Sequence, residues 1–455
     1  MARTAKKKEL SIEEKLAAAL VPEEEQPYKV PENWCWVNIA SVNFFAASSV
    51  NPTQHPEKTY ELYSVPSYDE EYPEIIIGEK IGSTKQSVIK DDVLLCKINP
   101  RINRVWKVAQ YTDNELLASS EWIVIRNTHM NSDYLVFWLK SPCFREYMLT
   151  NVSGVGGSLM RAKPKYVRNY PVPISPIDEQ QRIVSTIESL FADLNEAKAK
   201  LQTVLNGFAE RKAAILHQAF TGELTREWRE EHGESLSSWD EKNLDEVCLS
   251  IFDGDHMPPP KSETGIPFLV ISNVSNGKLS YENTRFVPHE YYNELSETRK
   301  PQLGDVLYTL VGTYGIPVIV DDERPFCFQR HMALLKPKAI ETRFLWYLLQ
   351  TQEMYQKASS IATGTAQMTV PIKGLRKLQF NCPPQSEQKV IVHILDHVLG
   401  NEQQAKSAVK SVLADIDTMK KSILARAFRG ELGTGDKKDE SAVSLLRQIL
   451  QQIEA

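Results

Sequence analysis

The sequence contains no long apolar run, no closely spaced cysteine pair and no excess of basic residues. No stretch approaches the ~20 apolar residues that a bilayer crossing requires, and the opening MARTAKKKEL lacks the apolar core of a secretion signal. The six cysteines are scattered without a C-x-x-C pair, so we expect reduced, mostly buried thiols instead of disulfides or a zinc knuckle. A net charge of −6 argues mildly against avid nonspecific DNA binding. We therefore expect a cytoplasmic protein.

Catalytic and metal-binding motifs are also missing. No G-x-x-x-x-G-K-[ST] phosphate loop occurs. The segment that starts at Asn381, NCPP, only superficially resembles the Asn-Pro-Pro-aromatic motif of adenine methyltransferases, because Gln385 stands where the aromatic would be. His393 and His397 have the i, i+4 spacing of a helical zinc pair, but no third ligand is apparent. We expect neither catalytic residues nor a bound metal.

What the sequence does contain is a long internal repeat. The segment 179–224 (EQQRIVSTIESLF…AILHQAFTGEL) recurs without a gap as 387–432 (EQKVIVHILDHVL…SILARAFRGEL), at an offset of 208 residues. Shorter similarities, such as Tyr134-Leu-Val-Phe-Trp-Leu with Phe344-Leu-Trp-Tyr-Leu-Leu, precede each copy. A repeat of this length exceeds a solenoid unit. It indicates two domain-sized halves with a common framework and different surfaces.

Each long copy has the spacing of a coiled-coil helix. Apolar residues alternate at three and four positions over more than four heptads, interrupted only by Arg211 in the first copy and Glu402 in the second. Pro176 and Pro384 precede the copies, where a helix tolerates proline. The predicted seam contains Ile183, Ile187, Leu190, Leu194, Leu201 and Phe208 in the first copy, and Ile391, Leu395, Val409, Val412, Ile416 and Ile423 in the second.

Such a seam requires a partner helix, and the second copy is the nearest one. If the ends of the intervening globular part lie close together, the second helix starts where the first stops and runs back along it. The pair is then antiparallel. Two helices packed separately in ordinary cores are the alternative.

The globular parts combine short strands with helices. In the first half we expect strands in EIIIGEK (74–80), DVLLCKI (92–98) and EWIVIR (121–126), followed by a helix over 132–149. The second half repeats this order with PFLVIS (267–272), DVLYTLVG (305–312), MALLK (332–336) and a helix over 342–358. The predicted fold class is α+β, with two globular domains joined by two long α-helices in an antiparallel coiled coil and a pseudo-two-fold repeat.

Basic and amide side chains cluster in loops of the first half. The loop after the strand DVLLCKI, KINPRINRVWK, contains no acid, and a second basic group lies in RAKPKYVR. Arginine, asparagine and glutamine offer the hydrogen bonds that read base edges, and lysine suits phosphates. A polar hairpin tip or a solvated face is the alternative for each cluster. The candidate DNA-binding residues are Lys97, Asn99, Arg101, Asn103, Arg104, Lys107, Ser158, Arg161, Lys163 and Lys165.

The loop of the second half that corresponds to Asn99–Arg104, Gly312 to Gly315, is nearly uncharged, which predicts a different half-site, whereas the basic cluster RAKPKYVR recurs there as Lys373, Arg376 and Lys377. Gly-rich segments there offer backbone amides and hydroxyls. The candidates are Asp253, His256, Thr313, Tyr314, Gln329, Arg330, His331, Gln367, Thr369 and Lys373. In the first half, Ser119, Ser120 and Glu121 occupy the position of Gln329 to His331, and the acid is placed to accept a hydrogen bond from cytosine N4 or to cap a strand.

With these features the chain resembles the specificity subunit of type I restriction-modification systems. The likeness rests on VPENWCWV (30–37), KDDVLL (90–95), PISPIDEQQRIV (173–184) and AILHQAFTGEL (214–224), and on their counterparts SSWDEKNLDEV, IFDGDHMPPP, LGDVLYTL, NCPPQSEQKVIV and SILARAFRGEL. It implies target recognition domains at 30–173 and 235–381 and helical spacers at 174–224 and 382–432. Two segments depart from this frame: a charged N-terminal extension (1–29) and a linker with a C-terminal helix at 433–455.

The resemblance also implies partners. Each recognition domain would read one half of a bipartite, asymmetric site in double-stranded DNA, while the coiled coil sets the gap and docks two modification subunits. Two restriction subunits complete the complex. The chain itself would be non-catalytic and bind no cofactor, with S-adenosylmethionine, ATP and magnesium on the partner subunits. Two other functions stay open: a modification enzyme in one polypeptide, which the missing cofactor motifs disfavour, and a two-headed scaffold that binds only proteins.

Overall fold

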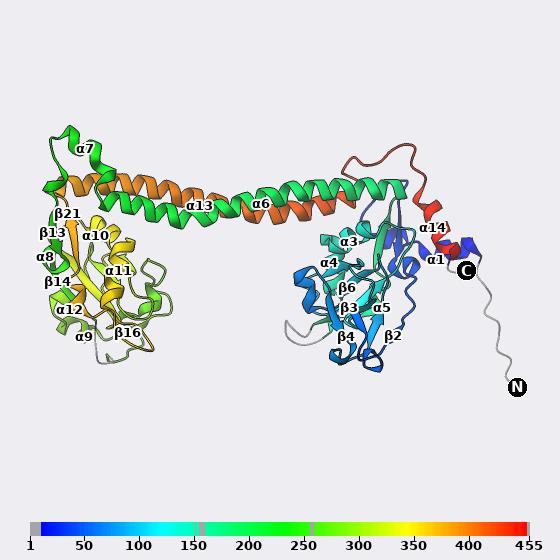
Figure 1. Cartoon of the computed structure of the whole chain (residues 1–455), viewed down its shortest axis with the longest axis horizontal. Coiled ribbons are helices and arrows are strands. Elements are labelled where there is room, and N and C mark those ends of the chain that lie inside the picture. Colours follow the sequence, from blue (N-terminus) through cyan, green and yellow to red (C-terminus); the bar gives the residue numbers. More distant parts are fainter. Residues whose placement is uncertain (1–10, 151, 154–159, 255–258, 453–455) are drawn as a thin grey trace. The chain divides into compact units, whose positions relative to one another are not determined.

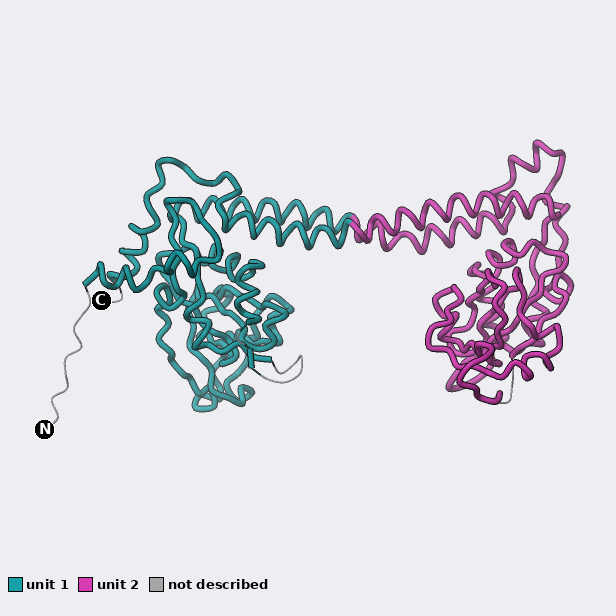
Figure 2. The backbone as a smooth tube through the Cα atoms, turned by 180° about the vertical axis from the view of Figure 1, so that it is seen from behind, with its two compact units in different colours: residues 1–200, 412–455 teal, residues 201–411 magenta. Residues whose placement is uncertain are grey.

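The chain forms two compact units in the computed structural model, which describes residues 11–150, 152–153, 160–254 and 259–452. Unit 1 contains residues 1–200 and 412–455, and unit 2 contains residues 201–411 (Figure 2). Each unit has one globular head and one stretch of each long helix, and we name the heads by their units. The predicted α+β class with two long paired helices is confirmed.

Head 1 is built on short strands in separate sheets. One sheet has the order β2-β5-β8-β3-β4 and another the order β7-β6-β9. The strands are β1 Cys35–Asn38, β2 Ser49–Val50, β3 Thr59–Tyr63, β4 Glu74–Ile77, β5 Lys85–Ser87, β6 Val93–Cys96, β7 Val105–Lys107, β8 Glu115–Ala118, β9 Trp122–Ile125, β10 Val152–Ser153, β11 Arg161–Ala162 and β12 Pro171–Ile174. The helices of unit 1, besides the long pair, are α1 Ile12–Ala19, α2 Ile39–Val42, α3 Ser132–Lys140, α4 Pro142–Thr150, α5 Pro164–Val167 and α14 Ala442–Gln452.

Head 2 has the same plan with different sheet sizes. Its main sheets have the orders β14-β20-β17-β18 and β16-β15-β19. The strands are β13 Asp240–Asn243, β14 Cys248–Asp253, β15 Ile266–Leu269, β16 Arg285–Val287, β17 Val306–Thr309, β18 Pro317–Ile319, β19 Cys327–Phe328, β20 Met332–Pro337 and β21 Gln379–Cys382. The shorter helices of unit 2 are α7 Arg226–Glu231, α8 Leu244–Val247, α9 His289–Glu294, α10 Thr342–Leu348, α11 Gln352–Ile361 and α12 Ile372–Leu375.

The first and last strands of each head pair with each other. In head 1, β1 runs antiparallel to β12 with Cys35 opposite Ile174. In head 2, β13 runs antiparallel to β21 with Asp240 opposite Cys382. The chain therefore enters and leaves head 2 at neighbouring points, which is the condition under which the second long helix can return along the first.

The helix predicted over 132–149 is in fact two helices. α3 ends at Lys140, and α4 begins at Pro142, which lacks the N–H that would continue the helix. Ser141 between them is extended (φ −66°, ψ 152°), as expected for a residue before proline. The helix predicted over 342–358 is likewise divided, between α10 and α11, where Thr351 caps the second helix.

Two helices of more than 40 residues carry the long repeat: α6 (Ile177–Phe220) and α13 (Gln385–Ala427). They lie side by side within each unit (Figure 1). In unit 1 the side chains of Lys198 and Asp417 form an ion pair of 3.0 Å, and Lys420 donates to Asn195 at 2.5 Å. Since the numbers rise on one helix as they fall on the other, the pairing is antiparallel, as predicted.

The predicted seam is unevenly covered. Ile183, Ile187, Phe208, Ile391, Leu395 and Ile416 are buried. Leu194, Leu201, Val409 and Ile423 are partly buried. By contrast, Leu190 is 37% and Val412 is 43% exposed, because two helices alone leave part of each seam open.

The two residues that interrupt the seam contact each other. Arg211 Nε lies 3.0 Å from Glu402 Oε2, and the guanidinium also stacks on the Phe208 ring at 4.3 Å. Both charges are substantially exposed, so the pair contributes about 0–1 kcal/mol to stability. A polar pair at a seam position mainly fixes which residues lie opposite each other.

The two ends of the described chain meet in unit 1. α1 begins with a capping box between Ser11 and Glu14, and it packs against α14 (Figure 1). Leu446 and Ile449 of α14 are fully buried in the core of head 1, so the apolar stripe of this helix is used in packing. None of the helices in the described ranges has the length and hydropathy of a membrane-spanning segment.

Candidate functional site

Three segments of head 1 that are distant in sequence are joined by backbone hydrogen bonds. The segment that follows β6 lies at the centre: the Lys97 amide donates to the Glu121 carbonyl at 3.1 Å, and the Asn99 amide donates to the Met160 carbonyl at 2.8 Å. The Ala162 amide returns to the Lys97 carbonyl at 2.8 Å. We call the segments 97–104, 119–121 and 160–165 the three-loop rim of head 1. It contains most of the candidate DNA-binding residues of the first half.

Head 2 has the same backbone bonds at the positions that the repeat predicts. The Leu310 amide donates to the His331 carbonyl at 2.8 Å, the Gly312 amide to the Met368 carbonyl at 3.0 Å, and the Val370 amide to the Leu310 carbonyl at 2.9 Å. The three-loop rim of head 2 consists of the segments 310–315, 329–331 and 367–373. One backbone framework is therefore used twice, with different side chains on it.

The turn after the central strand requires left-handed backbone in both rims. Asn99 has φ 45° and Asn103 has φ 53°, while Gly312 and Gly315 have φ 71° and 90°. Glycine and asparagine are the residues that adopt this conformation most readily. The left-handed backbone conformation therefore favours asparagine at positions 99 and 103. This is a second explanation for these residues, in addition to the hydrogen bonds to bases for which the sequence suggested them.

Charge in the rim of head 1 is arranged around one carboxylate. Glu121 Oε1 lies 3.4 Å from Arg161 Nη2, and Glu121 Oε2 lies 3.8 Å from Lys97 Nζ. Lys97 Nζ also donates to the Ser120 carbonyl at 2.6 Å. The Arg161 side chain is 53% exposed and is therefore accessible to a ligand. The rim thus presents a carboxylate acceptor between two cations.

Other predicted residues of head 1 contact neighbouring helices. Lys107 Nζ forms an ion pair of 2.7 Å with Asp133 in the first turn of α3, and Asn103 Nδ2 donates to the Leu139 carbonyl at 3.2 Å. The carbonyl of Arg101, whose side chain is exposed, accepts from Arg145 Nη2 at 2.6 Å. Lys163 and Lys165 lie over the Tyr166 ring, while Arg104 is partly buried and Ser158 lies outside the described residues.

In head 2 the predicted residues gather around one cavity. A cavity of about 550 Å³ is lined by Asp253, Arg330, His331, Gln367, Thr369 and Lys373, among others. Burial, and secondarily the charge of Arg330, lowers the pKa of His331, so its imidazole is neutral at pH 7. Tyr314 stacks on Tyr355 with ring centroids 5.5 Å apart. Thr313 is exposed, Gln329 is partly buried, and His256 lies outside the described residues.

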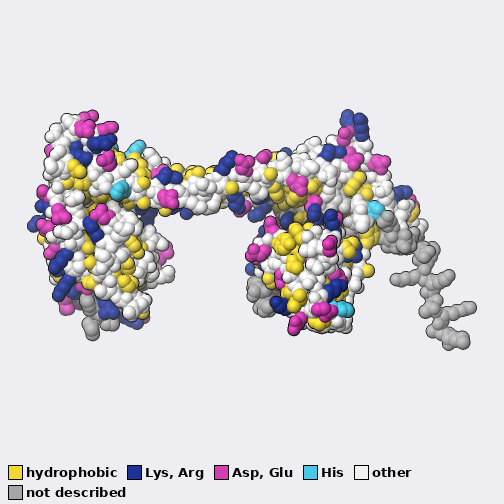
Figure 3. Space-filling view, viewed as in Figure 1, with side chains coloured by type: hydrophobic (Ala, Val, Ile, Leu, Met, Phe, Trp, Pro, Cys, Tyr) yellow, Lys and Arg dark blue, Asp and Glu magenta, His cyan; other side chains and the backbone are white. Residues whose placement is uncertain are grey.

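A matching cavity lies at the rim of head 1. It measures about 650 Å³ and is lined by Lys97, Ser120, Trp122, Pro164, Lys165 and Arg168, with Phe45 and Gln86. Lys97, Ser120 and Lys165 correspond in the repeat to Leu310, Arg330 and Lys373 of the head 2 cavity. On the face shown in Figure 3, Lys and Arg side chains lie among Asp and Glu in each head.

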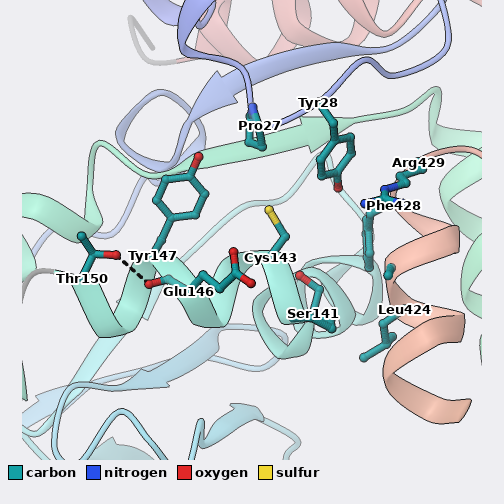
Figure 4. A pocket seen from close by; sticks show the side chains of 12 residues that line it. Pro27, Tyr28, Ser141, Cys143, Glu146, Tyr147, Thr150, Leu424, Phe428 and Arg429 are labelled. Carbon is teal, nitrogen blue, oxygen red and sulfur yellow. Dashed lines mark hydrogen bonds between the residues drawn. The ribbon is translucent and has the colours of Figure 1, made fainter. Parts of the chain in front are cut away.

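A third cavity was not predicted from the sequence. It measures about 440 Å³ and lies in unit 1 between α4, the end of α13 and the segment at Pro27 and Tyr28 (Figure 4). Tyr28, Tyr147 and Phe428 supply its aromatic walls, and Glu146 and Arg429 its charges. Burial raises the pKa of Cys143 in this cavity to about 11, so the thiol stays protonated at pH 7.

The repeated Glu-Gln pair at the start of each long helix is a further functional element that the sequence did not explain. Glu387 is 1% exposed and accepts from Trp239 Nε1 at 2.8 Å and Thr225 Oγ1 at 2.6 Å, and it forms an ion pair with Arg229. Glu179 is 2% exposed and accepts from Trp34 Nε1 at 2.8 Å and Thr434 Oγ1 at 3.3 Å. Each glutamate therefore joins its head to its long helix.

The neighbouring glutamines make a second repeated link. Gln180 accepts from the Asn131 amide at 2.9 Å and donates to the Ser175 carbonyl at 2.8 Å. Gln388 accepts from the Glu341 amide at 2.8 Å and donates to the Pro383 carbonyl at 2.8 Å. Each glutamine ties the start of a head helix to the turn before the long helix. Recurrence of the pair at the same offset was the signal that could have revealed it.

Comparison with known proteins adds family evidence. Residues 237–411 match the family model described as "Type I restriction modification DNA specificity domain". The chain is 26% identical over 322 residues to the type I restriction enzyme EcoKI specificity subunit of Escherichia coli, covering 66% of each chain. It is 23% identical to the MjaVIII specificity subunit of Methanocaldococcus jannaschii, covering 89% of this chain and 94% of that one.

Two solved structures share the fold. One, from a study of complex assembly and conformational transition of the type I R-M system, has a TM-score of 0.74 at 22% identity, covering 89% of this chain and 100% of that one. The HsdS subunit of Thermoanaerobacter tengcongensis has a TM-score of 0.61 at 23% identity, covering 90% of this chain and 100% of that one.

Proposed function

We propose that the chain is a specificity subunit of the type I restriction-modification kind, to which its sequence and fold are similar, and that it binds double-stranded DNA and reads a bipartite, asymmetric sequence. Each head would read one half-site with its three-loop rim. The observation that carries this proposal is the shared framework, since the same three backbone hydrogen bonds hold both rims while the side chains on them differ. Equal frameworks predict equal modes of docking, and unequal side chains predict unequal half-sites.

We infer a supporting role for the two long helices. An antiparallel pair with a polar contact between Arg211 and Glu402 has a fixed register, so it is suited to set the gap between half-sites. The relatives are specificity subunits by name. The partners would be two modification subunits and two restriction subunits. Methyl transfer and ATP hydrolysis, with S-adenosylmethionine, ATP and magnesium, would take place on those partners, and this chain would be non-catalytic.

Binding to DNA duplexes tests the proposal directly. The full-length chain, alone and with its modification partner, is titrated with a randomised duplex library, and bound sequences are read by sequencing. We expect two short motifs separated by a fixed gap, and an affinity that falls steeply with salt because Lys and Arg side chains displace counterions from phosphates. Methyl transfer by the purified chain alone would favour the single-polypeptide enzyme instead, and indifference to every duplex would favour the protein scaffold.

A further inference from the structure

The rim of head 1 contains buried polar atoms that lack a hydrogen-bond partner. Among the described residues, no group donates a hydrogen bond to Glu121 Oε2 or Asn99 Oδ1, and none accepts one from Arg104 Nε. Burying a polar atom without a hydrogen-bond partner destabilises the fold, because the atom loses its hydrogen bond to water and gains none in return. Asn103 Oδ1 is a fourth atom of this kind, so three acceptors and one donor of the rim lack a partner. This set indicates a site that is completed by a ligand with both donors and acceptors, as the edges of base pairs have.

The charged set around Glu121 is not required by the backbone of the rim. Its members Lys97, Glu121 and Arg161 correspond in the repeat to Leu310, His331 and Thr369 in head 2. Head 2 nevertheless keeps the three equivalent backbone hydrogen bonds, at 2.8, 3.0 and 2.9 Å against 3.1, 2.8 and 2.8 Å in head 1. The fold therefore tolerates an apolar residue, an imidazole and a hydroxyl at these positions. The charged residues of head 1 are therefore not needed to hold this backbone framework together, and their presence has a different explanation.

On this basis, and resting on the proposed DNA-reading function, we propose that Glu121 is a specificity-determining residue that selects cytosine at one position of the half-site of head 1. Arg161, 3.4 Å from Glu121, reads the guanine of the same base pair. Lys97, 3.8 Å from Glu121, offsets the repulsion between the carboxylate and nearby phosphates. The half-site of head 2, which has no carboxylate at the equivalent position, carries no such requirement.

The donor and acceptor pattern of the major groove gives the reason. Cytosine presents only its N4 donor, and a carboxylate can only accept. Guanine and thymine present acceptors, which repel the carboxylate, and adenine places the N7 acceptor beside its N6 donor. Glu121 therefore favours one base and disfavours the others, and the adjacent Arg161 guanidinium matches guanine O6 and N7.

The substitution Glu121→Gln tests the assignment, because glutamine can pair with both N6 and N7 of adenine. Full-length wild-type and variant chains are compared in selection from a duplex library randomised across both half-sites. We expect the preference for cytosine at one position to fall about ten- to hundredfold and adenine to become acceptable there. Arg161→Ala should weaken discrimination at the same base pair. His331→Gln, the matched change in head 2, should leave the head 1 half-site unaltered.

The outcomes separate this inference from the function on which it rests. If the wild-type chain selects no sequence, the proposed function is wrong and the inference falls with it. If the wild-type chain selects a bipartite motif and Glu121→Gln selects the same base at every position, only the inference is overturned. The half-site of head 2 serves as the internal control for folding. Loss of both half-sites in Glu121→Gln and in Glu121→His would assign Glu121 to the fold and would also overturn it.

Discussion

Removal of the Glu387 carboxylate should destabilise unit 2 more than the matched change at Glu179 destabilises unit 1. Glu387→Ala removes the acceptor of Trp239 and Thr225 and leaves the Arg229 guanidinium, which is 7% exposed, without its anion. Removing one partner of a buried ion pair costs about 3–5 kcal/mol. Glu179→Ala removes two hydrogen bonds but leaves no buried arginine without its anion, so it should lower the free energy of unfolding by about 1–3 kcal/mol.

Hydrogen exchange followed by mass spectrometry measures this difference, because it reports opening of each unit separately. We expect peptides of α10 and β21 in Glu387→Ala to lose about 2 kcal/mol more protection than peptides of α3 and β12 lose in Glu179→Ala. The double variant Glu387→Ala/Arg229→Met should recover part of the loss, since no unpaired charge then stays buried. Equal losses in the two single variants, or no recovery in the double variant, would refute the role assigned to Arg229.

Three further predictions concern the rest of the chain. Gly430 and Gly433 have nearly the same φ, 74° and 73°. A Cβ at Gly430 would lie 2.3 Å from a proline ring, whereas one at Gly433 would meet nothing within 4 Å. In chemical unfolding, Gly430→Ala should therefore be more destabilising than Gly433→Ala by about 1–3 kcal/mol. Glu402→Ala should lower the free energy of unfolding by no more than about 1 kcal/mol in the same assay. Replacing both Arg211 and Glu402 by leucine should raise the free energy of unfolding but allow α6 and α13 to pair in more than one register, which disulfide cross-linking between the two helices would detect. Because thiolate is the reactive form and the pKa of Cys143 is about 11, its alkylation rate should rise nearly tenfold per pH unit between pH 7 and 10, and a plateau near pH 9 would contradict the assigned burial.

The long helices could be predicted because their spacing depends only on local periodicity. Apolar residues at alternating intervals of three and four specify a seam, and the one long partner in the chain specifies the pairing. The contact between Arg211 and Glu402 could not be predicted, because periodicity alone does not show which residues of the two helices lie opposite each other. The break at Ser141 was missed because an apolar pattern continued past Pro142, although the proline itself was a visible signal.

The sequence showed which loops of the candidate site correspond between the two halves, but not which contacts their individual side chains make. The repeat matched each loop of the first half with its counterpart in the second, and equivalent backbone hydrogen bonds hold these loops in the two heads. That the three loops of one head lie beside each other was not predicted. The repeat could not tell that Lys107 is paired with Asp133, because that contact depends on how β7 packs against α3. Nor could it give Glu179 a role, since its partner Trp34 is 145 residues away. Tertiary contacts of this kind decide which members of a polar cluster remain available to a ligand.

The central claim is that two unlike heads read two unlike half-sites across a gap that the paired helices set. Single-molecule mapping of adenine methylation tests it most directly, in cells that contain the modification partner and either the wild-type chain or a variant with four facing residues removed from both α6 and α13. We expect a bipartite motif with dissimilar halves, and a gap shortened by one or two base pairs in the variant, since four residues span about 6 Å and a base pair about 3.4 Å. A single continuous motif, or an unaltered gap in the variant, would contradict the account.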